Sequence, residues 1–377
     1  MTQGQKLKEL ALVFFKLGCF AFGGPAAHIA MMEDEVVTKR KWMDRQHFLD
    51  LIGATNLIPG PNSTEMTMHC GHERAGVPGL FVAGFCFIFP AVVITGILAW
   101  LYVTYGTLPE IEPFIRGIQP AVLVIIASAI FKLGKKAIKN WELALLGTLV
   151  LTASLSGIHE VAALLIGGLV GASYFFLKNK LKSPSVKTIV PFLWFSFSIQ
   201  TLTKVTTVKI FWTFLKVGSI LYGSGYVLFA YLDAELVTTG LLKRSELIDA
   251  IGMGQFTPGP VLSTATFIGY QLGGFWGALA ATLGIFLPSF VFVWVLNPLV
   301  PKMQRSKLLR GFLDSVNVAA VAVMLAVLYT MSIETLIDWK AGLIALLSAI
   351  IIFGFKKVSV LWVVLLGSLL GYALHWI

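Results

Sequence analysis

Two short stretches of the chain, residues 58–65 and 257–264, combine a helix break with polar side chains. Each contains a Pro-Gly-Pro sequence that is followed by hydroxyl-bearing residues. Proline lacks a backbone donor and suits the first turn of a helix, whereas glycine permits a sharp turn, so each stretch is predicted to end one helix and begin another. The unpaired N–H groups and the positive dipole end of the new helix attract anions. The chemistry expected at both places is therefore anion binding.

The residues that could contact such an anion carry hydroxyl or amide groups. Five of them follow a Pro-Gly-Pro sequence: Asn62, Ser63, Thr64, Ser263 and Thr264. The other two, Asn56 and Gln255, lie about one helical turn before it. The alternative interpretation is that the hydroxyls cap helix ends and that the amides bond to the broken backbone. Two copies at matching places favour anion binding. The helix breaks themselves are assigned to Pro59, Gly60, Pro61, Pro258, Gly259 and Pro260.

Two lysines, Lys16 and Lys216, occupy matching places about two turns inside apolar segments. A cation at membrane depth costs ~2.5–3.5 kcal/mol on the insertion scale, so it normally pairs, lines a cavity or extends to the surface. One hypothesis is that the two lysines attract a divalent anion from opposite sides. The alternative is that each side chain reaches the membrane surface.

Glu65 and His69 are four residues apart and are predicted to share one face of a short helix. A carboxylate beside an anion site is unfavourable unless it is protonated or paired, so these two residues are candidates for proton coupling. The alternative is an ion pair between Glu65 and Arg45 or Arg74. Because Thr264 replaces Glu65 in the second copy, a coupling role would be confined to the first.

The composition indicates the environment of these residues. Of the 377 residues, 57% are hydrophobic and 13% are charged, against about 25% charged residues in soluble domains. The apolar stretches have helical length and lack the alternation of a barrel, so an all-α, polytopic membrane protein is predicted. The net charge of +10 comes from Lys and Arg in short loops, which is an orientation signal and not a nucleic-acid surface. The three cysteines have no metal-ligand or redox spacing, so no metal or cofactor is expected.

The second half of the chain repeats the first. Residues 15–38 align without a gap with residues 215–238, and Pro90 aligns with Pro288 beyond the Pro-Gly-Pro pair. Such internal similarity indicates two structural repeats. We therefore divide the chain into a first repeat at 1–178, a linker at 179–208 and a second repeat at 209–377.

Each repeat is expected to cross the membrane five times and to contain one re-entrant pair of short helices, at 46–72 and at 245–271. The expected crossings are 10–31, 79–104, 114–134, 141–157, 160–177, 210–232, 273–298, 308–330, 338–354 and 359–376. Basic loops at 135–139 and 302–310 are assigned to the cytoplasm. Because five is odd, the halves would be oppositely oriented. The prediction is thus an inverted repeat of about ten transmembrane helices and two broken pairs, as in many secondary transporters.

In such transporters the helix breaks meet near the midplane of the bilayer. This arrangement adds a third break to the candidate site, at Gly23, Gly24 and Pro25, with a counterpart at 223–225. The second copy reads Gly-Ser-Gly where the first reads Gly-Gly-Pro, so symmetric use of the two copies is left open.

At these motifs the sequence resembles the chromate transporter family of oxyanion exporters. The resemblance is carried by Phe22-Gly23-Gly24-Pro25, by residues 59–65 and by residues 254–260, and it extends through 269–271 and 284–289. It spans both halves and resembles the two-domain form of the family. It implies a multi-pass protein of the bacterial inner membrane that expels chromate from the cytoplasm and confers chromate resistance.

The function expected is secondary transport of a small inorganic oxyanion across the lipid bilayer, driven by the membrane potential, by protons or by both. Export of a divalent anion from a negative cell gains ~4–5 kcal/mol per 100 mV. Sulfate is the alternative substrate because it has the same charge and shape as chromate. A passive anion channel and a membrane-embedded enzyme are less favoured, the latter because no H-E-x-x-H motif is present. A homodimer is the oligomeric state considered.

Overall fold

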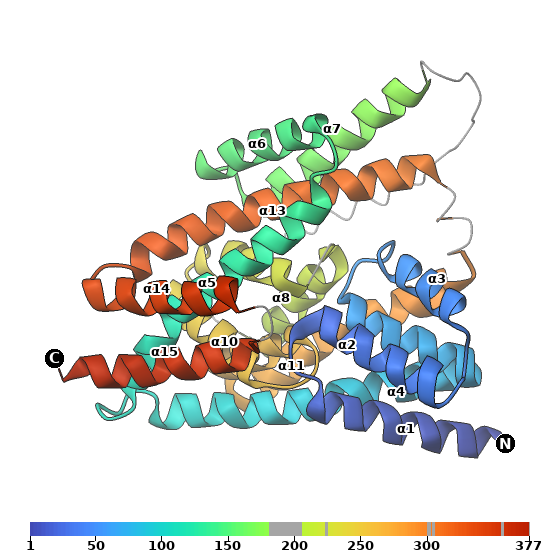
Figure 1. Ribbon diagram of the computed structural model, residues 1–377, viewed down its shortest axis with the longest axis horizontal. Helices are drawn as coiled ribbons and strands as arrows, with labels where there is room; N and C mark the ends of the chain where they lie inside the picture. Colours follow the sequence, from blue (N-terminus) through green and yellow to red (C-terminus); the bar gives the residue numbers. More distant parts are fainter. Residues whose placement is uncertain (181–205, 223–224, 300–302, 304–305, 356–357, 377) are drawn as a thin grey trace.

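The computed structural model describes residues 1–180, 206–222, 225–299, 303, 306–355 and 358–376. Most of the linker expected at 179–208 lies outside these residues. The secondary structure described is helical throughout, which agrees with the all-α prediction. The two halves present their helices in the same order (Figure 1).

The first half contains seven α-helices. They are α1 (Gln3–Phe20), α2 (Gly24–Glu33), α3 (Arg45–Thr55), α4 (Asn62–Tyr105), α5 (Glu112–Ala137), α6 (Trp141–Leu155) and α7 (Glu160–Lys180). A π-helix, Asp34–Lys39, continues α2. The helix starts follow local sequence signals: Thr2 and Gln5 form a capping box, and Asp44 accepts a hydrogen bond from the His47 amide.

The second half repeats this order. Its helices are α8 (Thr207–Ile220), α9 (Leu228–Leu232), α10 (Arg244–Phe256), α11 (Thr264–Leu296), α13 (Lys307–Thr335), α14 (Trp339–Gly354) and α15 (Val360–His375). Short 3-10 turns precede α9 and α11, at Gly225–Val227 and Val261–Ser263, and the π-helix Asp233–Val237 follows α9. The repeat is therefore present in the structure as well as in the sequence.

The first apolar segment of each half does not cross as a single helix, and the expectation of crossings at 10–31 and 210–232 is corrected. Glu9, near the start of α1, pairs with Arg40, beyond the end of α2, at 3.1 Å. In the second half, Lys216 of α8 pairs with Glu235 at 2.6 Å. Such contacts require the chain to double back, and Figure 1 shows α2 returning alongside α1. Each half therefore begins with a helical hairpin that turns within the protein.

The two longest helices, α4 and α11, share an unusual kink. The dihedral angles at Ala75 (−146°, 20°) and Gly76 (66°, −155°) are nearly those at Gly273 (−154°, 25°) and Gly274 (58°, −149°). Glycine accepts such a positive φ at little cost, so both helices bend at matching places. The part of each helix before the kink pairs with α3 or α10 across Pro-Gly-Pro, as expected for the re-entrant pairs.

The long helices of the two halves pack against each other in antiparallel fashion. Phe81, early in α4, stacks on Phe290, late in α11, with ring centroids 5.5 Å apart. At the other end, Tyr102 of α4 lies against Phe267 of α11 at 5.3 Å. The start of one helix thus meets the end of the other.

The remaining helices interlock the two halves. α5 packs against α14 and α15 of the second half, while α13 packs against α6 and α7 of the first. Close approach of α5 and α15 is possible because Gly117 faces Gly367 and Gly371 across the interface, where an added β-carbon would overlap backbone atoms.

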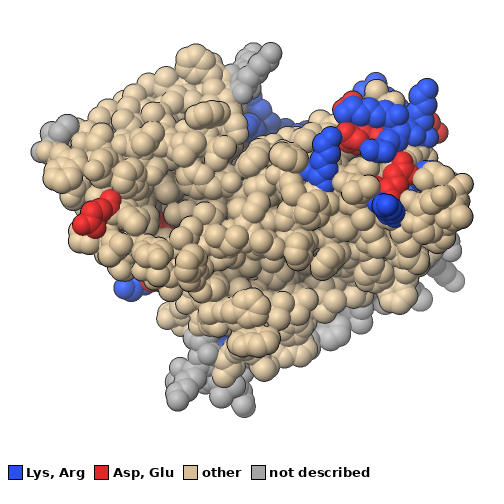
Figure 2. Space-filling view, turned by 90° about the horizontal axis from the view of Figure 1, so that it is seen from below, with Lys and Arg blue, Asp and Glu red and all other residues tan. Residues whose placement is uncertain are grey.

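The outer surface is apolar over a broad area. Four helices among the described residues are long and apolar enough to cross a membrane, and α6, α7, α14 and α15 supply shorter apolar helices. Large apolar side chains are exposed at every fourth position of α4 and α11: Phe81, Phe85, Phe89, Val93 and Ile97, and Leu279, Leu283, Leu287, Val291 and Val295. Figure 2 shows a wide face with few charges, and acidic and basic groups gathered mainly near one end. Such a surface faces lipid.

Candidate functional site

Each Pro-Gly-Pro turn lies against the hairpin turn of the opposite half. The N–H of Gly60 donates to the carbonyl oxygen of Leu221 at 2.7 Å, and the N–H of Gly259 donates to that of Ala21 at 2.9 Å. Leu221 and Ala21 are the residues at which α8 and α1 end. The four helix breaks therefore meet as two equivalent pairs, each joining both halves.

The first Pro-Gly-Pro turn and both hairpin turns border a cavity of about 440 Å³, which we call the lysine cavity. Its wall includes four residues predicted from the sequence: Gly23, Pro25, Asn56 and Asn62. The second half contributes Gly225, Tyr226 and the early part of α13, and α5 contributes its last turns. This volume is typical of small-molecule sites.

Three lysines and one aspartate give the lysine cavity its charge: Lys132, Lys136, Lys139 and Asp314. Lys139 pairs with Asp314 at 2.6 Å. Within the described part of the chain, neither Lys132 nor Lys136 has an acidic partner. Three positive charges and one negative charge leave a net charge of two, which matches a divalent anion.

Lys132 and Lys136 were not predicted as site residues from the sequence, because basic residues near residue 135 were interpreted only as an orientation signal. Their spacing of four places them on one face of α5, and this was the available indication. Lys135 differs, since its ammonium lies 4.2 Å from the ring centroid of Phe131 and does not line the cavity.

The two amides at the first turn bond to each other. Nδ2 of Asn62 donates to Oδ1 of Asn56 at 2.8 Å, and Nδ2 of Asn56 donates to the Ile52 carbonyl at 2.9 Å. Asn56 thus bonds to the backbone of its own helix, which is the alternative that the sequence left open. Both side chains nevertheless line the lysine cavity.

The predicted hydroxyls lie in the protein interior and do not line this cavity. Ser63, Thr64, Ser263 and Thr264 are at most 1% exposed. Thr264 donates to the Val261 carbonyl at 2.9 Å, so its hydroxyl is bonded to the local backbone. The Thr64 hydroxyl has no partner among the described residues. The amides of Asn56 and Asn62 therefore line the lysine cavity, whereas the four hydroxyls do not.

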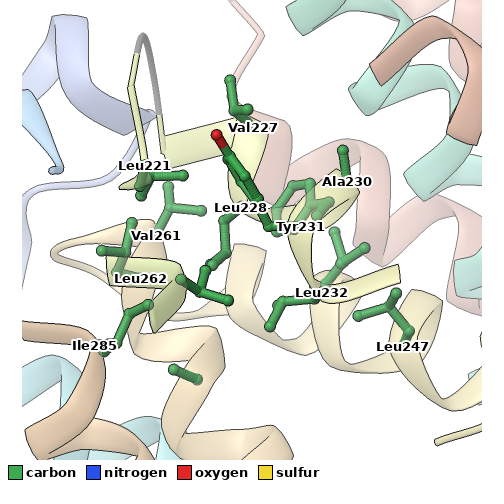
Figure 3. Packing of buried hydrophobic residues seen from close by; sticks show 14 of the residues in the cluster. Leu221, Val227, Leu228, Ala230, Tyr231, Leu232, Leu247, Val261, Leu262 and Ile285 are labelled. Atoms are coloured by element: carbon green, nitrogen blue, oxygen red, sulfur yellow. The ribbon is translucent and has the colours of Figure 1, made fainter. Parts of the chain in front are cut away.

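The second Pro-Gly-Pro turn is surrounded by apolar side chains. Val261 and Leu262 stand where the first turn has Asn62 and Ser63. Figure 3 shows both of them packed with Leu221, Leu228 and Ile285. The two halves thus share a backbone arrangement, but the polar site is built on the first.

Gly23, Gly24 and Gln255 meet at a much smaller cavity of about 20 Å³. His28 and the first residues of α15 complete its wall. Nδ1 of His28 and Nε2 of Gln255 have no partner within the described residues. The volume holds about one water molecule. Because Gly23 lines both cavities, it forms part of the wall that divides them.

Lys16 and Lys216 lie beside acidic residues of their own hairpins. Lys216 pairs with Glu235, as described above. Lys16 is exposed. The pKa of Glu35 is lowered chiefly by its hydrogen bond with Lys39, and the charge of Lys16 contributes. Neither lysine lines the cavities described here, so their predicted role in substrate binding stays a prediction.

Glu65 and His69 lie one turn apart on α4 but form no hydrogen bond with each other. Nδ1 of His69 lies 3.1 Å from Oδ1 of Asn297 in the other half. Glu65 is fully buried, and neither of its oxygens has a partner among the described residues. The expected ion pair with Arg45 or Arg74 is wrong, because these arginines pair with Glu33 and Glu9 instead.

Glu65 lies at the first Pro-Gly-Pro turn, next to Ser289 of α11. A β-carbon added to Gly60 would overlap Oε1 of Glu65 and lie 2.5 Å from Oγ of Ser289. Oγ of Ser289 also lacks a partner in the described residues. Two unpaired polar side chains, one from each half, therefore flank the same glycine.

A third cavity, of about 770 Å³, lies at the opposite ends of α5 and α13 from the lysine cavity. Its acidic residues outnumber its basic ones: Glu112, Glu246, Asp249, Glu334 and Asp338 against Arg116, Lys243 and Lys340. Asp249 accepts hydrogen bonds from Tyr102 and Gln119 at 2.7 and 2.8 Å. The two large cavities thus differ in the sign of their charge.

These features define the class of protein. Apolar helices of membrane-crossing length, a repeated architecture and paired helix breaks beside a basic cavity characterise a membrane transporter. The chain belongs to the chromate transporter family, whose family model matches it twice, over residues 8–172 and 208–372.

Individual relatives are similar over both halves. The chain is 27% identical to the chromate transport protein of Cupriavidus metallidurans, over 97% of this chain and 92% of that protein. It is 29% identical to a probable chromate transport protein of Synechococcus elongatus, over 91% and 90% of the two chains. It is 27% identical to an uncharacterized transporter of Methanocaldococcus jannaschii, over 97% and 93%. No solved structure matches the chain.

Proposed function

We propose that this protein exports chromate from the cytoplasm and that the lysine cavity is where the anion enters. The observation that carries the proposal is the unpaired charge of Lys132 and Lys136 beside the first pair of helix breaks. Family membership and the names of two relatives support chromate as the anion. The potential of a negative cell favours movement of a dianion outward by ~4–5 kcal/mol per 100 mV.

The membrane topology we propose is an inverted repeat. In each half the bilayer-spanning segments include α4 beyond its kink and α5, with α11 beyond its kink and α13 as their counterparts. The hairpins and the helices flanking Pro-Gly-Pro enter and leave on one side. The antiparallel packing of α4 on α11 supports opposite orientation of the two halves. This packing now carries the orientation, because the hairpins remove one of the five crossings expected in each half.

Loop charge supports the direction of transport. Basic residues concentrate at the end of α5 and before α13, which supports a cytoplasmic location of the lysine cavity. The cavity at the opposite ends of α5 and α13, with its excess of acidic groups, would then face outward. A dianion is attracted to the first cavity and released readily from the second, because like charges repel.

Sulfate is the second candidate substrate. It shares the charge and tetrahedral shape of chromate, and lysines separated by an open cavity discriminate little between them. The supporting observation is the same cavity, which contains no feature specific to chromium.

Flux of radiolabelled chromate into proteoliposomes tests the function and the substrate together. We expect uptake that saturates with chromate concentration and that sulfate inhibits. Flux that never saturates would indicate a channel, and sulfate uptake without chromate uptake would reassign the substrate.

A further inference from the structure

Glu65 stands out among the acidic side chains of the described residues. It is 0% exposed, whereas both of its oxygens lack a hydrogen-bond partner in the described part of the chain. An ionised carboxylate in such surroundings is prohibitively costly, so the group must be neutral or hold a cation. A neutral carboxyl group carries a proton.

Ser289 supplies the neighbouring polar group. Its hydroxyl is 0% exposed, has no partner in the described residues and flanks Gly60 together with Glu65. A hydroxyl can donate to a carboxylate and accept from a carboxylic acid. Ser289 can therefore bond to Glu65 in either protonation state after a small side-chain movement. This pairing crosses the interface between the halves, which must change when the protein alternates its access.

The second half has no equivalent pair. At the positions that match Glu65 and Ser289 stand Thr264, whose hydroxyl donates to the Val261 carbonyl, and Ala91, which packs beside Gly259. The structure thus contains two equivalent turns, of which the first carries a carboxyl group. At the second, the buried His28 lies 3.0 Å from the Ala21 carbonyl that also accepts from Gly259. The proposed single proton per transport cycle rests on the one carboxyl group.

Few other titratable groups share this environment. Tyr222 follows Leu221, whose carbonyl accepts from the N–H of Gly60. His69, one turn further along the same helix, points to Asn297. No charged side chain forms an ion pair with Glu65 within the described residues. The protonation of Glu65 is therefore governed by burial and by the occupant of the adjacent cavity.

Resting on the function proposed above, we propose that Glu65 and Ser289 form a proton site and that one proton travels with each anion in the same direction. Asn62, on the wall of the lysine cavity, precedes Glu65 by about one turn of α4. A dianion in the cavity repels a carboxylate, so anion binding favours the protonated form of Glu65. By linkage, protonation of Glu65 strengthens anion binding equally. The occupied transporter then moves one net negative charge, not two.

The test measures charge and proton movement per chromate in proteoliposomes that contain the full chain. At alkaline pH, where the anion itself carries no proton, a trapped pH-sensitive dye reports proton movement. For the unaltered protein we expect one proton and one net charge per chromate. For Glu65→Gln, whose amide has nearly the same shape, we expect chromate flux with no proton and with two charges, a twofold rise in current per chromate.

Glu73→Gln is the matched control, because Glu73 lies two turns further along the same helix and pairs with His47 at the surface. It should leave both ratios unchanged. Proton movement that persists in Glu65→Gln, or two charges per chromate in the unaltered protein, would overturn the proposal. A sodium requirement in place of proton movement would overturn it too.

A second readout does not depend on transport. Infrared spectroscopy of the purified protein should show the C=O stretch of a protonated carboxyl group at neutral pH, and this band should disappear in Glu65→Gln. Absence of the band in the unaltered protein would overturn the proton site. If the band is present and no chromate moves, the proposed substrate fails while the protonated Glu65 stands.

Discussion

Simultaneous replacement of Lys132 and Lys136 by glutamine is expected to lower chromate flux at low substrate concentration by at least about tenfold. Both residues line the lysine cavity and lack an acidic partner among the described residues. A dianion near one positive charge gains roughly 1–2 kcal/mol even in water-like surroundings, and more where the dielectric constant is lower. Loss of both lysines therefore removes most of the attraction that concentrates the anion. Flux should be measured as the initial rate below saturation.

The control for the lysine variant is Lys135→Gln. Lys135 lies on the same turn of α5 but over the ring of Phe131, outside the cavity wall. It should transport chromate at nearly the original rate. The difference in chromate flux between the double variant and the unaltered protein should also become smaller at high ionic strength, because salt screens exposed charges. Equal rates for the control and the double variant would remove the cavity from the transport route.

Replacement of Gly60 by alanine is expected to destabilise the protein severely and to abolish chromate transport. Gly60 has a φ of 144°, and an added β-carbon would overlap Oε1 of Glu65 and crowd Oγ of Ser289. The unfavourable dihedral angle costs about 1–3 kcal/mol, and overpacking costs a similar amount. Both side chains are fully buried, so room for the β-carbon requires their displacement within the packed interface. The measurement is the thermal unfolding temperature of the detergent-purified protein, together with its flux.

Gly240→Ala separates the two causes. Gly240 also has a positive φ, of 72°, but an added β-carbon would meet no atom within 4 Å. This variant incurs the dihedral cost alone and should lower the unfolding temperature much less. If the two variants are equally stable, the close packing of the first turn does not constrain the protein as described.

The sequence predicted the architecture well where the signal was a repeat. The alignment of the two halves and the two Pro-Gly-Pro breaks led to equivalent elements, and the structure has them. The hairpins were missed because hydropathy cannot distinguish one long apolar helix from two short ones that fold back. The contacts that reveal the fold, such as Glu9 with Arg40, join residues far apart in the sequence.

The candidate site was predicted in part, since the residues at helix breaks were found and the lysines were not. Gly23, Pro25, Asn56 and Asn62 line the lysine cavity as a group. Whether a hydroxyl faces the cavity or the protein interior depends on how the helix after each turn is rotated about its axis. A sequence motif does not specify this rotation. The asymmetry was visible in advance, because Val261 and Leu262 in the second turn cannot donate to an anion from their side chains.

The central claim is that the lysine cavity passes a divalent anion through the membrane. The most direct measurement is radiolabelled chromate movement in proteoliposomes with an imposed potential of either sign. We predict accumulation of chromate on the positive side, with the logarithm of its concentration ratio proportional to the potential, and none in protein-free vesicles. Failure of chromate to move at either polarity, in vesicles whose protein is folded, would contradict the account.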